Sequence, residues 1–334
     1  MTARRPVAVL GSGSWGTALG MLCARNGQPV GLWVRDVGSA ARIQRERVHA
    51  RYFPNLPLPA GLAIHNDLAN VVARYPDLVI AVPSVHFKTL LTQLAPLLSG
   101  HRLGWATKGL EPGTGRLLSE VCGELIGHDT PHAVLSGPSF AGEVARGLPT
   151  AVTVAASEAG FAEDLAAVFS GKDFRVYTSS DMVGVQLGGA VKNVLAIAAG
   201  IADGLGFGAN ARAGLITRGL AELMRFGEAV GAQRETLVGL SGLGDLVLTC
   251  TDDQSRNRRF GLAIGRGASL AEAKTAVGQA VEGAETARVV LQAAARAGVD
   301  MPICQAVHDI LFAGLAPRHA VAELLGRSLK AESV

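Results

Sequence analysis

The sequence predicts an α/β protein in which a Rossmann-like, doubly wound, mostly parallel sheet domain is followed by an all-helical C-terminal domain. Short apolar segments alternate with helical segments in the first half of the chain, and a Gly-x-Gly-x-x-Gly sequence follows the first of them. From about residue 181 onward the apolar spacing is helical. The length of 334 residues suffices for two domains, which we place at 1–180, dinucleotide-binding, and 181–334, substrate-binding.

Short apolar segments that end in small or polar residues predict the strands of the first domain. They span residues 7–10, 30–34, 77–82, 103–106, 133–135, 150–155 and 174–177. Helices are expected over 17–26 and 158–169. Because helical segments separate these short apolar runs, we expect crossover connections and a parallel sheet that is buried on both faces. The segment Tyr52–Pro59 contains three prolines and is expected to form a surface loop.

The second domain is predicted to be helical because Ala, Leu and Val recur at helical spacing. The expected helices span residues 181–203, 211–230, 258–265, 269–277, 283–297 and 302–312. The longest weakly polar stretch, Val194–Ala202, is shorter than the ~20 apolar residues that span a membrane. We therefore expect no membrane insertion.

Composition and charge exclude several other classes of protein. A formal net charge of +3 is too small to predict nucleic-acid binding. The four cysteines are far apart and lack a Cys-x-x-Cys pair, which is typical of reduced thiols in an intracellular protein. The apolar run at Val7–Leu10 is too short for a signal peptide, so we expect a cytoplasmic protein. His128 and His132 lie in a predicted loop, and we predict no metal site.

The glycine motif at residues 11–16 predicts a dinucleotide site. It lies between a predicted strand and a predicted helix, which makes chance occurrence in a glycine-rich chain the weaker explanation. Gly11 would make the tight turn, Gly13 would let the pyrophosphate approach the backbone, and Gly16 would let the helix pack on the strand. The helix N-terminus would then hold the phosphates.

The choice of dinucleotide depends on two residues after the second predicted strand. Arg35 would accommodate the 2′-phosphate of NADP, whereas Asp36 would bind the ribose hydroxyls of NAD. The alternative is a solvated Arg-Asp turn with no role in binding. We favour NADP(H) and keep NAD(H) as the second choice.

Polar residues also follow other predicted strands and helices. These groups span residues 81–84, 106–109, 136–141, 188–193 and 244–257. The first three lie at the carboxyl ends of predicted parallel strands, where such sheets bind ligands. Lys108 and Lys192 are flanked by small or apolar residues, so burial would lower the pKa of the ammonium group toward values suited to proton transfer. The alternative is a lysine whose ammonium group reaches solvent past its packed stem.

The segment Ser255-Arg256-Asn257 offers a hydroxyl, a guanidinium and an amide, which are typical ligands of a phosphate monoester. The alternative is a solvated helix face, and two of the three arginines Arg256, Arg258 and Arg259 are expected to be solvated. Aromatic residues are not interleaved with these basic residues, which favours a small phosphorylated substrate over a nucleic acid.

The chain resembles the bacterial-type glycerol-3-phosphate dehydrogenases that use NAD(P)+. The resemblance rests on the following segments in order: 11–16, Ala106-Thr107-Lys108-Gly109-Leu110, Leu135-Ser136-Gly137-Pro138-Ser139-Phe140-Ala141, Ala190-Val191-Lys192-Asn193, Gly242-Leu243-Gly244-Asp245-Leu246, Asn257-Arg258-Arg259-Phe260-Gly261 and Val281-Glu282-Gly283. They cover nearly the whole chain, and their combination is specific.

The resemblance implies an oxidoreductase that reversibly reduces dihydroxyacetone phosphate to sn-glycerol 3-phosphate for glycerophospholipid biosynthesis. It assigns the catalytic proton transfer to Lys192. The implied substrate-binding residues are Lys108, Gly137, Ser139, Lys192, Asp245, Ser255, Arg256 and Asn257. The implied cofactor-binding residues, with the glycines of the motif, are Gly11, Gly13, Ser14, Trp15, Gly16, Arg35, Tyr52, Lys108, Ala141, Arg256, Ala280 and Glu282. Ser139 stands where some relatives have threonine, which keeps the hydroxyl.

Two other functions are compatible with these residues. One is another two-domain dehydrogenase, such as a ketopantoate-reductase-like or hydroxyacid enzyme, which would not need the phosphate ligands at 255–257. The other is a nucleotide-binding or redox-sensing protein without catalysis, which would not need Lys192. The apolar surface expected on the helical domain is compatible with a homodimer.

Overall fold

The computed structural model describes residues 5–278 and 280–325, which form two compact units. The first unit is the chain up to Thr107 together with Leu118–Met182, and it is an α/β unit. The second is helical and consists of Lys108–Leu117 and the chain from Val183 onward. The predicted fold class is thus confirmed. The short segment Lys108–Leu117 belongs to the helical unit although strands precede and follow it in sequence.

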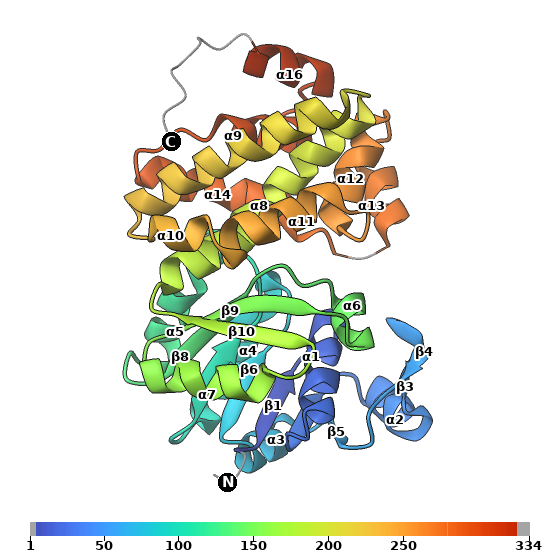
Figure 1. Ribbon diagram of the computed structural model, residues 1–334, viewed down its shortest axis with the longest axis vertical. Coiled ribbons are helices and arrows are strands. Elements are labelled where there is room, and N and C mark those ends of the chain that lie inside the picture. Colours follow the sequence, from blue (N-terminus) through green and yellow to red (C-terminus); the bar gives the residue numbers. More distant parts are fainter. Residues whose placement is uncertain (1–4, 279, 326–334) are drawn as a thin grey trace. The chain divides into compact units, whose positions relative to one another are not determined.

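The first unit contains an eight-stranded sheet with the order β10-β9-β8-β7-β6-β1-β2-β5 (Figure 1). All neighbouring strands are parallel except β8 and β9. The strands are β1 (Val7–Leu10), β2 (Val30–Trp33), β5 (Leu62–His65), β6 (Asp77–Ile80), β7 (Arg102–Trp105), β8 (His132–Ser136), β9 (Thr150–Ala156) and β10 (Phe174–Ser179). All seven predicted strands are confirmed, and β5 is the one sheet strand that the apolar pattern did not predict.

The first strand, β1, is purely apolar because it lies inside the sheet with a strand on either side. In β1, every residue is buried, and Val7 lies opposite Val30 of β2 and Asp77 of β6. A strand paired on both edges and covered on both faces favours apolar side chains along its length. The N-terminal segment is thus a core strand.

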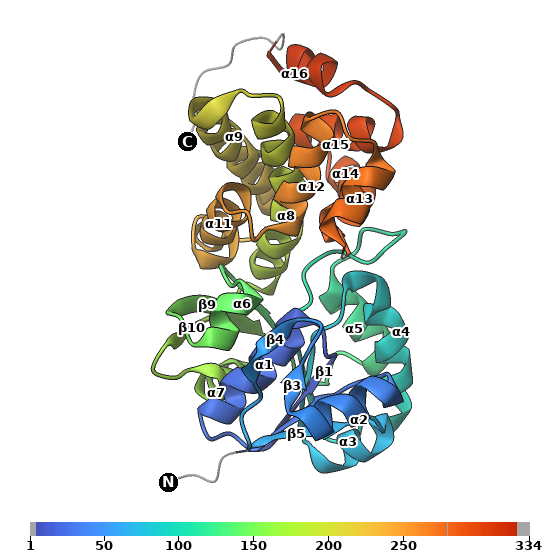
Figure 2. The same cartoon turned by 90° about the vertical axis from the view of Figure 1, so that its right-hand side faces the viewer.

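Helices cover both faces of this sheet. Figure 2 shows α1 and α7 on one side of it, and α4 and α5 on the other. The helices are α1 (Ser14–Arg25), α2 (Val37–Glu46), α3 (Leu68–Arg74), α4 (Ser84–Leu94), α5 (Leu118–Ile126), α6 (Ala141–Arg146) and α7 (Ala159–Phe169), with a 3-10 turn at Ala95–Leu97. The sequence predicted α1 and α7 to within three residues at each end.

The expectation of a loop at Tyr52–Pro59 is wrong. Residues Phe53–Pro57 form β4, which pairs antiparallel with β3 (Val48–His49) in a separate two-stranded hairpin. Proline is tolerated here because a strand with only one neighbour needs few backbone donors. Phe53, only 8% exposed, anchors the hairpin in the apolar core of the first unit.

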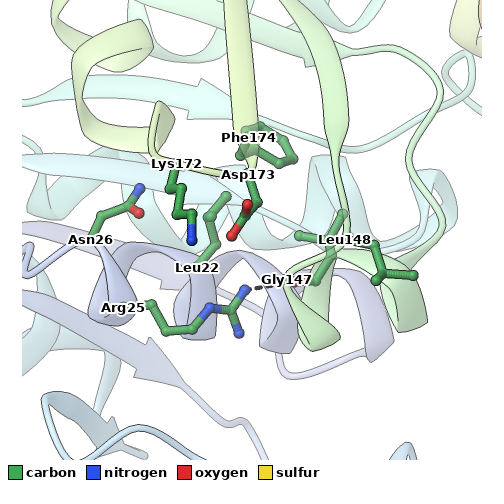
Figure 3. A pocket seen from close by; sticks show the side chains of 9 residues that line it. Leu22, Arg25, Asn26, Gly147, Leu148, Lys172, Asp173 and Phe174 are labelled. Atoms are coloured by element: carbon green, nitrogen blue, oxygen red, sulfur yellow. Dashed lines mark hydrogen bonds between the residues drawn. The ribbon is translucent and has the colours of Figure 1, made fainter.

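The C-terminal end of α1 is locked against two other helices of the first unit. Arg25 donates hydrogen bonds to the carbonyls of Val144 and Ala145 in α6, at 2.6 and 2.7 Å. Asn26 donates to carbonyls at the end of α7, at 2.9 and 3.1 Å. Figure 3 shows this region, a pocket of about 130 Å³ into which Lys172 and Asp173 also point. These polar groups satisfy helix-end carbonyls and fix the helix that carries the glycine motif.

The second unit is built around α8 (Met182–Gly204), which is buried from Gly184 to Ala202. The other helices are α9 (Gly208–Ala229), α10 (Arg234–Leu237), α11 (Asp245–Thr251), α12 (Arg256–Gly265), α13 (Leu270–Val277), α14 (Glu282–Arg296), α15 (Pro302–Phe312) and α16 (Pro317–Leu325), with a π-turn at Leu240–Gly244. The six predicted helices are confirmed, whereas α10, α11 and α16 were not predicted.

By length and composition, α8 could cross a membrane; among the described residues it is the one such helix. Its apolar stretch is wholly buried in the second unit, which is the environment of a core helix in a soluble domain.

The four cysteines Cys23, Cys122, Cys250 and Cys304 are buried free thiols, as their spacing predicted.

Candidate active site

The glycine motif has the geometry of a phosphate-binding turn. Gly11 has a φ of +121°, and a Cβ there would lie 2.8 Å from the carbonyl oxygen of Ala81. A Cβ on Gly16 would lie 2.0 Å from the carbonyl oxygen of Gly11, so only glycine lets α1 pack this closely. Gly13 faces open space and is the N-cap of α1, with no side chain capping the helix. The free N–H groups of this helix end fit the pyrophosphate of a dinucleotide.

The loop opens into a pocket of about 210 Å³ in the first unit. Three predicted cofactor residues line it, namely Gly11, Gly13 and Arg35. Asp36 is not among the lining residues, because its carboxylate caps α2 by accepting a hydrogen bond from the Ser39 N–H at 2.7 Å. Hydrogen bonding from the Ser39 side chain, together with this backbone bond, holds the pKa of Asp36 below its usual range. Arg35 therefore lines the pocket, whereas the adjacent Asp36 stabilises the start of α2.

Part of the pocket was missed by sequence reasoning. From α4, His86, Thr89 and Gln93 line it, and Trp33 lines it from the end of β2. The positions 86, 89 and 93 follow helical spacing, so they lie on one face of α4 directly after the strand end at Ile80. A solvated helix face has the same spacing, so no signal in the sequence distinguishes the two.

The remaining predicted cofactor and substrate residues of the first unit do not line this pocket. Ser14 and Trp15 lie in the first turn of α1, and Tyr52 lies between β3 and β4 with its ring 4.8 Å from that of His49. Ala141 is the first residue of α6. Gly137 and Ser139 follow β8, and the Ser139 hydroxyl donates to the Gly137 carbonyl at 2.9 Å. The φ of +146° at Gly137 requires glycine in this turn.

The second unit brings two predicted lysines and one predicted carboxylate together. Lys192 of α8 is 6% exposed, and its Nζ donates to Asp245 Oδ1 at 2.5 Å and to Thr249 Oγ1 at 3.0 Å. Lys108 donates to the other carboxylate oxygen of Asp245 at 2.7 Å. Asp245, 1% exposed, thus bridges both ammonium groups. The interpretation of Lys192 as a lysine that reaches solvent is wrong.

Burial sets the acid-base behaviour of Lys192. Desolvation lowers the pKa of its ammonium group to about 8, with Lys108 acting in the same direction and Asp245 opposing it. An ammonium group with this pKa is protonated at neutral pH and is still able to release its proton. The arrangement suits proton transfer to and from a substrate oxygen.

Close backbone packing places these side chains. A Cβ on Gly188 would lie 2.2 Å from the carbonyl oxygen of Ser241, so α8 runs directly against the π-turn that precedes α11. Asp245 is the first residue of α11. The glycine-rich segments around Lys192 and Asp245 therefore let the helices approach until the two side chains meet.

The predicted phosphate ligands lie at the start of α12. Ser255 is its N-cap and accepts a hydrogen bond from the Arg258 N–H at 3.2 Å. Asn257 is buried; its amide donates to Asn193 Oδ1 and accepts from the Gly283 N–H, each at 2.9 Å. Asn257 thus joins α12 to α8 and α14.

Charged residues of the second unit surround this region. Glu282 begins α14, and desolvation raises the pKa of its carboxyl group, with Arg256, Lys192 and Lys108 opposing the rise. Ala280 is exposed in the segment before α14. The expectation of two solvated arginines is only partly right: Arg259 is exposed, but Arg258 is 8% exposed and forms ion pairs with Asp203 and Asp253.

No group of three or more His, Cys, Asp or Glu side chains is arranged to hold a metal ion within residues 5–278 and 280–325.

The chain joins a sheet unit that has a dinucleotide turn to a helical unit that buries a lysine against a carboxylate. This combination defines a two-domain nicotinamide-dependent oxidoreductase. The chain belongs to the NAD-dependent glycerol-3-phosphate dehydrogenase family. Residues 6–162 match the N-terminal model of this family, and residues 181–322 match its C-terminal model.

Individual relatives agree with this family. The chain is 60% identical over 328 residues to glycerol-3-phosphate dehydrogenase (NAD(P)+) of Thioalkalivibrio sulfidiphilus, covering 98% of both chains. It is 58% identical to the enzyme of the same name from Nitrosococcus oceani, covering 97% of this chain and 94% of the relative. The crystal structure of glycerol-3-phosphate dehydrogenase from Coxiella burnetii has a TM-score of 0.93 at 50% identity, covering 97% and 99% of the chains.

A ketopantoate reductase from Ralstonia eutropha shares the fold alone. Its TM-score is 0.59 at 15% identity, over 95% of this chain and 99% of that chain. The resemblance inferred from the sequence motifs is thus confirmed, and the ketopantoate-reductase-like alternative is the more distant one.

Proposed function

We propose that this chain is an NAD(P)-dependent glycerol-3-phosphate dehydrogenase that reversibly reduces dihydroxyacetone phosphate to sn-glycerol 3-phosphate. In the cytoplasm, its product would supply the backbone of glycerophospholipids. The observation that carries the proposal is the buried bridge from Lys192 through Asp245 to Lys108. A protein that only binds or senses nucleotides would have no use for this bridge, because burying the charged groups of Lys192 and Asp245 is costly.

The proposed chemistry divides between cofactor and protein. When bound, the reduced nicotinamide supplies a hydride to C2 of the ketone. The Lys192 Nζ donates a proton to the alkoxide oxygen that develops at C2, and in the reverse direction it accepts the proton of the hydroxyl group. Asp245 accepts hydrogen bonds from both ammonium groups and so holds them in place. Lys108 would polarise the carbonyl; one preorganised donor of this kind stabilises a developing oxyanion by roughly 3 kcal/mol.

The charges of the second unit favour a phosphorylated substrate. Arg256, Lys192 and Lys108 all lie close enough to Glu282 to oppose the rise of its pKa, so three cationic side chains are grouped there for an anionic ligand. We assign phosphate binding to Ser255, Arg256 and Asn257 at the start of α12, where the helix dipole also favours an anion. The further substrate contacts that we propose are Lys108, Gly137, Ser139, Lys192 and Asp245.

For the cofactor we propose NADP(H), with NAD(H) as the second choice. Arg35 lines the pocket, whereas the carboxylate of Asp36 is engaged in capping α2 and is not directed at a ribose. A guanidinium without a competing carboxylate favours the 2′-phosphate. The cofactor contacts that we propose are Gly11, Gly13, Ser14, Trp15, Gly16, Arg35, Tyr52, Lys108, Ala141, Arg256, Ala280 and Glu282.

One assay tests substrate and cofactor together. Purified protein is mixed with NADPH or NADH and with dihydroxyacetone phosphate, unphosphorylated dihydroxyacetone or ketopantoate, and the loss of absorbance at the nicotinamide band is followed. We expect rapid oxidation of NADPH with dihydroxyacetone phosphate only. Equal rates with the unphosphorylated ketone would contradict the phosphate assignment, and faster turnover of ketopantoate would contradict the proposed substrate.

A homodimer is also proposed. Apolar side chains of the second unit, among them Phe207, Val238 and Val247, are 40–45% exposed. Such surface favours association when it is continuous. Sedimentation velocity at micromolar concentration tests this, and a monomer across the whole concentration range would contradict it.

A further inference from the structure

The hairpin of β3 and β4 contacts the glycine motif through one side chain. His49 is 7% exposed, and its Nε2 lies 2.9 Å from the carbonyl oxygen of Ser12. A carbonyl oxygen only accepts hydrogen bonds, so Nε2 carries the proton and donates it. Ser12 lies between Gly11 and Gly13 and lines the dinucleotide pocket.

The direction of the Ser12 carbonyl determines the direction of a phosphate donor. In a planar trans peptide, the carbonyl of Ser12 and the N–H of Gly13 point in opposite directions, and the described chain contains no cis peptide. A hydrogen bond that holds the carbonyl toward His49 therefore holds the Gly13 N–H on the opposite side of the peptide plane. Gly13 is the N-cap of α1, so its N–H is among the donors available to a pyrophosphate.

The glycines on either side of Ser12 leave this peptide wide backbone freedom. A Cβ built on Gly13 would meet no atom within 4 Å, and glycine has the widest backbone freedom of all residues. The loop must remain made of glycine for the pyrophosphate to approach. A hydrogen bond from outside the loop can fix the peptide plane, and His49 supplies one to the Ser12 carbonyl.

The imidazole is in turn held by its hairpin. The ring of Tyr52 lies 4.8 Å from it, and Phe53 is its partner across the hairpin. Burial lowers the pKa of His49, which favours the neutral ring. Its other nitrogen, Nδ1, is buried without a hydrogen-bond partner among the described residues, so the bond to Ser12 is the one link of the ring nitrogens to another residue there. The hydrogen bond of this buried histidine is therefore directed at the glycine loop.

We propose that His49 is a positioning residue of the dinucleotide site, which aims the Gly13 N–H at the pyrophosphate by holding the Ser12 carbonyl. The inference rests on the proposed function for the identity of the ligand. It also gives the β3–β4 hairpin a role, since the hairpin lies outside the main sheet.

The test compares two amide side chains of different length. His49→Gln keeps a donor at about the reach of Nε2, whereas His49→Asn has the same amide one bond too short, and His49→Phe keeps the ring without the donor. Binding of NADPH and of adenosine 2′-monophosphate, which lacks the pyrophosphate, is measured by titration calorimetry. We expect Asn and Phe to weaken NADPH binding about tenfold, the value of one net hydrogen bond, and Gln to restore most of it. Binding of adenosine 2′-monophosphate should change less than twofold.

His65→Phe is the matched control. His65 of β5 is a partly buried histidine of the same unit, and its Nε2 lies 3.0 Å from the hydroxyl oxygen of Tyr75, outside the residues that line the pocket. Its loss should lower the melting temperature without weakening NADPH binding. If wild-type protein binds neither NADPH nor NADH, the proposed function fails. If wild-type protein binds and His49→Asn binds equally well, or loses both ligands equally, or is not rescued by Gln, the positioning role is overturned.

Discussion

The dinucleotide pocket of the first unit and the lysine cluster of the second unit rely on different chemical groups. The phosphate-binding turn at the pocket is made by backbone, with glycines at 11, 13 and 16 and an uncapped helix end. The cluster is made by side chains, with Lys108, Asp245 and Lys192 bonded at 2.5–2.7 Å. A recurring ligand part such as a pyrophosphate is held by backbone N–H groups, whereas proton transfer needs a side chain with an adjusted pKa. We therefore expect the two regions to fail in different ways when they are altered.

The largest effect is expected for Lys192→Met, which removes the proton donor and keeps an unbranched side chain. General acid-base catalysis contributes about 10²–10⁴-fold, so kcat should fall by that range while NADPH still binds. Rates are measured with saturating substrate, and NADPH binding by fluorescence titration. The control is Lys172→Met, an exposed lysine of the first unit, which should keep wild-type turnover. Turnover within a few-fold of wild type in folded Lys192→Met would remove this residue from the mechanism.

This contrast also shows what the sequence was able to predict. Lys192 was predicted because charge is rare in apolar helical sequence, and the glycine motif was predicted because its backbone demands are local. The Lys108–Asp245 bond joins residues 137 positions apart, and no local pattern encodes it. Asn257 illustrates the same limit, because no local pattern encodes the hydrogen bonds of its amide to Asn193 and Gly283.

The sequence also could not predict which of two neighbouring polar residues faces the ligand. Arg35 and Asp36 stand side by side, and only the start of α2 shows that the carboxylate serves as a helix cap. The pocket face of α4 was missed because exposed polar positions at helical spacing are the same whether they face solvent or a ligand.

Two glycines of the backbone-built pocket are expected to respond in opposite ways. For Gly16→Ala, the new methyl would lie 2.0 Å from the Gly11 carbonyl oxygen, so overpacking of about 1–3 kcal/mol should lower the melting temperature. Gly13→Ala has free space and a φ of −67°, so its stability should be unchanged or slightly higher. Its methyl should nevertheless weaken NADPH binding, since it occupies the approach of the pyrophosphate.

Thermal unfolding and NADPH titration of both glycine variants separate packing from binding. A stable Gly16→Ala protein, or a Gly13→Ala protein with unchanged affinity for NADPH, would contradict the roles assigned to these two positions. Either result would also weaken the distinction between a backbone-built and a side-chain-built region.

The pKa of Lys192, in the side-chain-built region, should appear in the pH dependence of the rate. Because Lys192 has a pKa of about 8, it is protonated below that pH and neutral above it. Reduction of the ketone needs the protonated form, so its kcat/KM should be level at low pH and fall about tenfold per pH unit above pH 8. Oxidation of the alcohol needs the neutral form and should rise up to about pH 8. Profiles that bend in the same direction for both reactions would exclude Lys192 as the titrating group.

The smallest effect is expected where a side chain contributes to the backbone-built pocket. Arg35→Ala removes one guanidinium from an exposed position of the lining, so the KM for NADPH should rise about tenfold while the KM for NADH stays within twofold. The control is Arg45→Ala on α2, an exposed arginine paired with Glu46. Since both cofactors share the pyrophosphate, the His49 and Gly13 variants should weaken both alike, and only Arg35 should separate them. An equal loss for NADPH and NADH in Arg35→Ala would place this guanidinium on the shared part of the cofactor rather than on the 2′-phosphate.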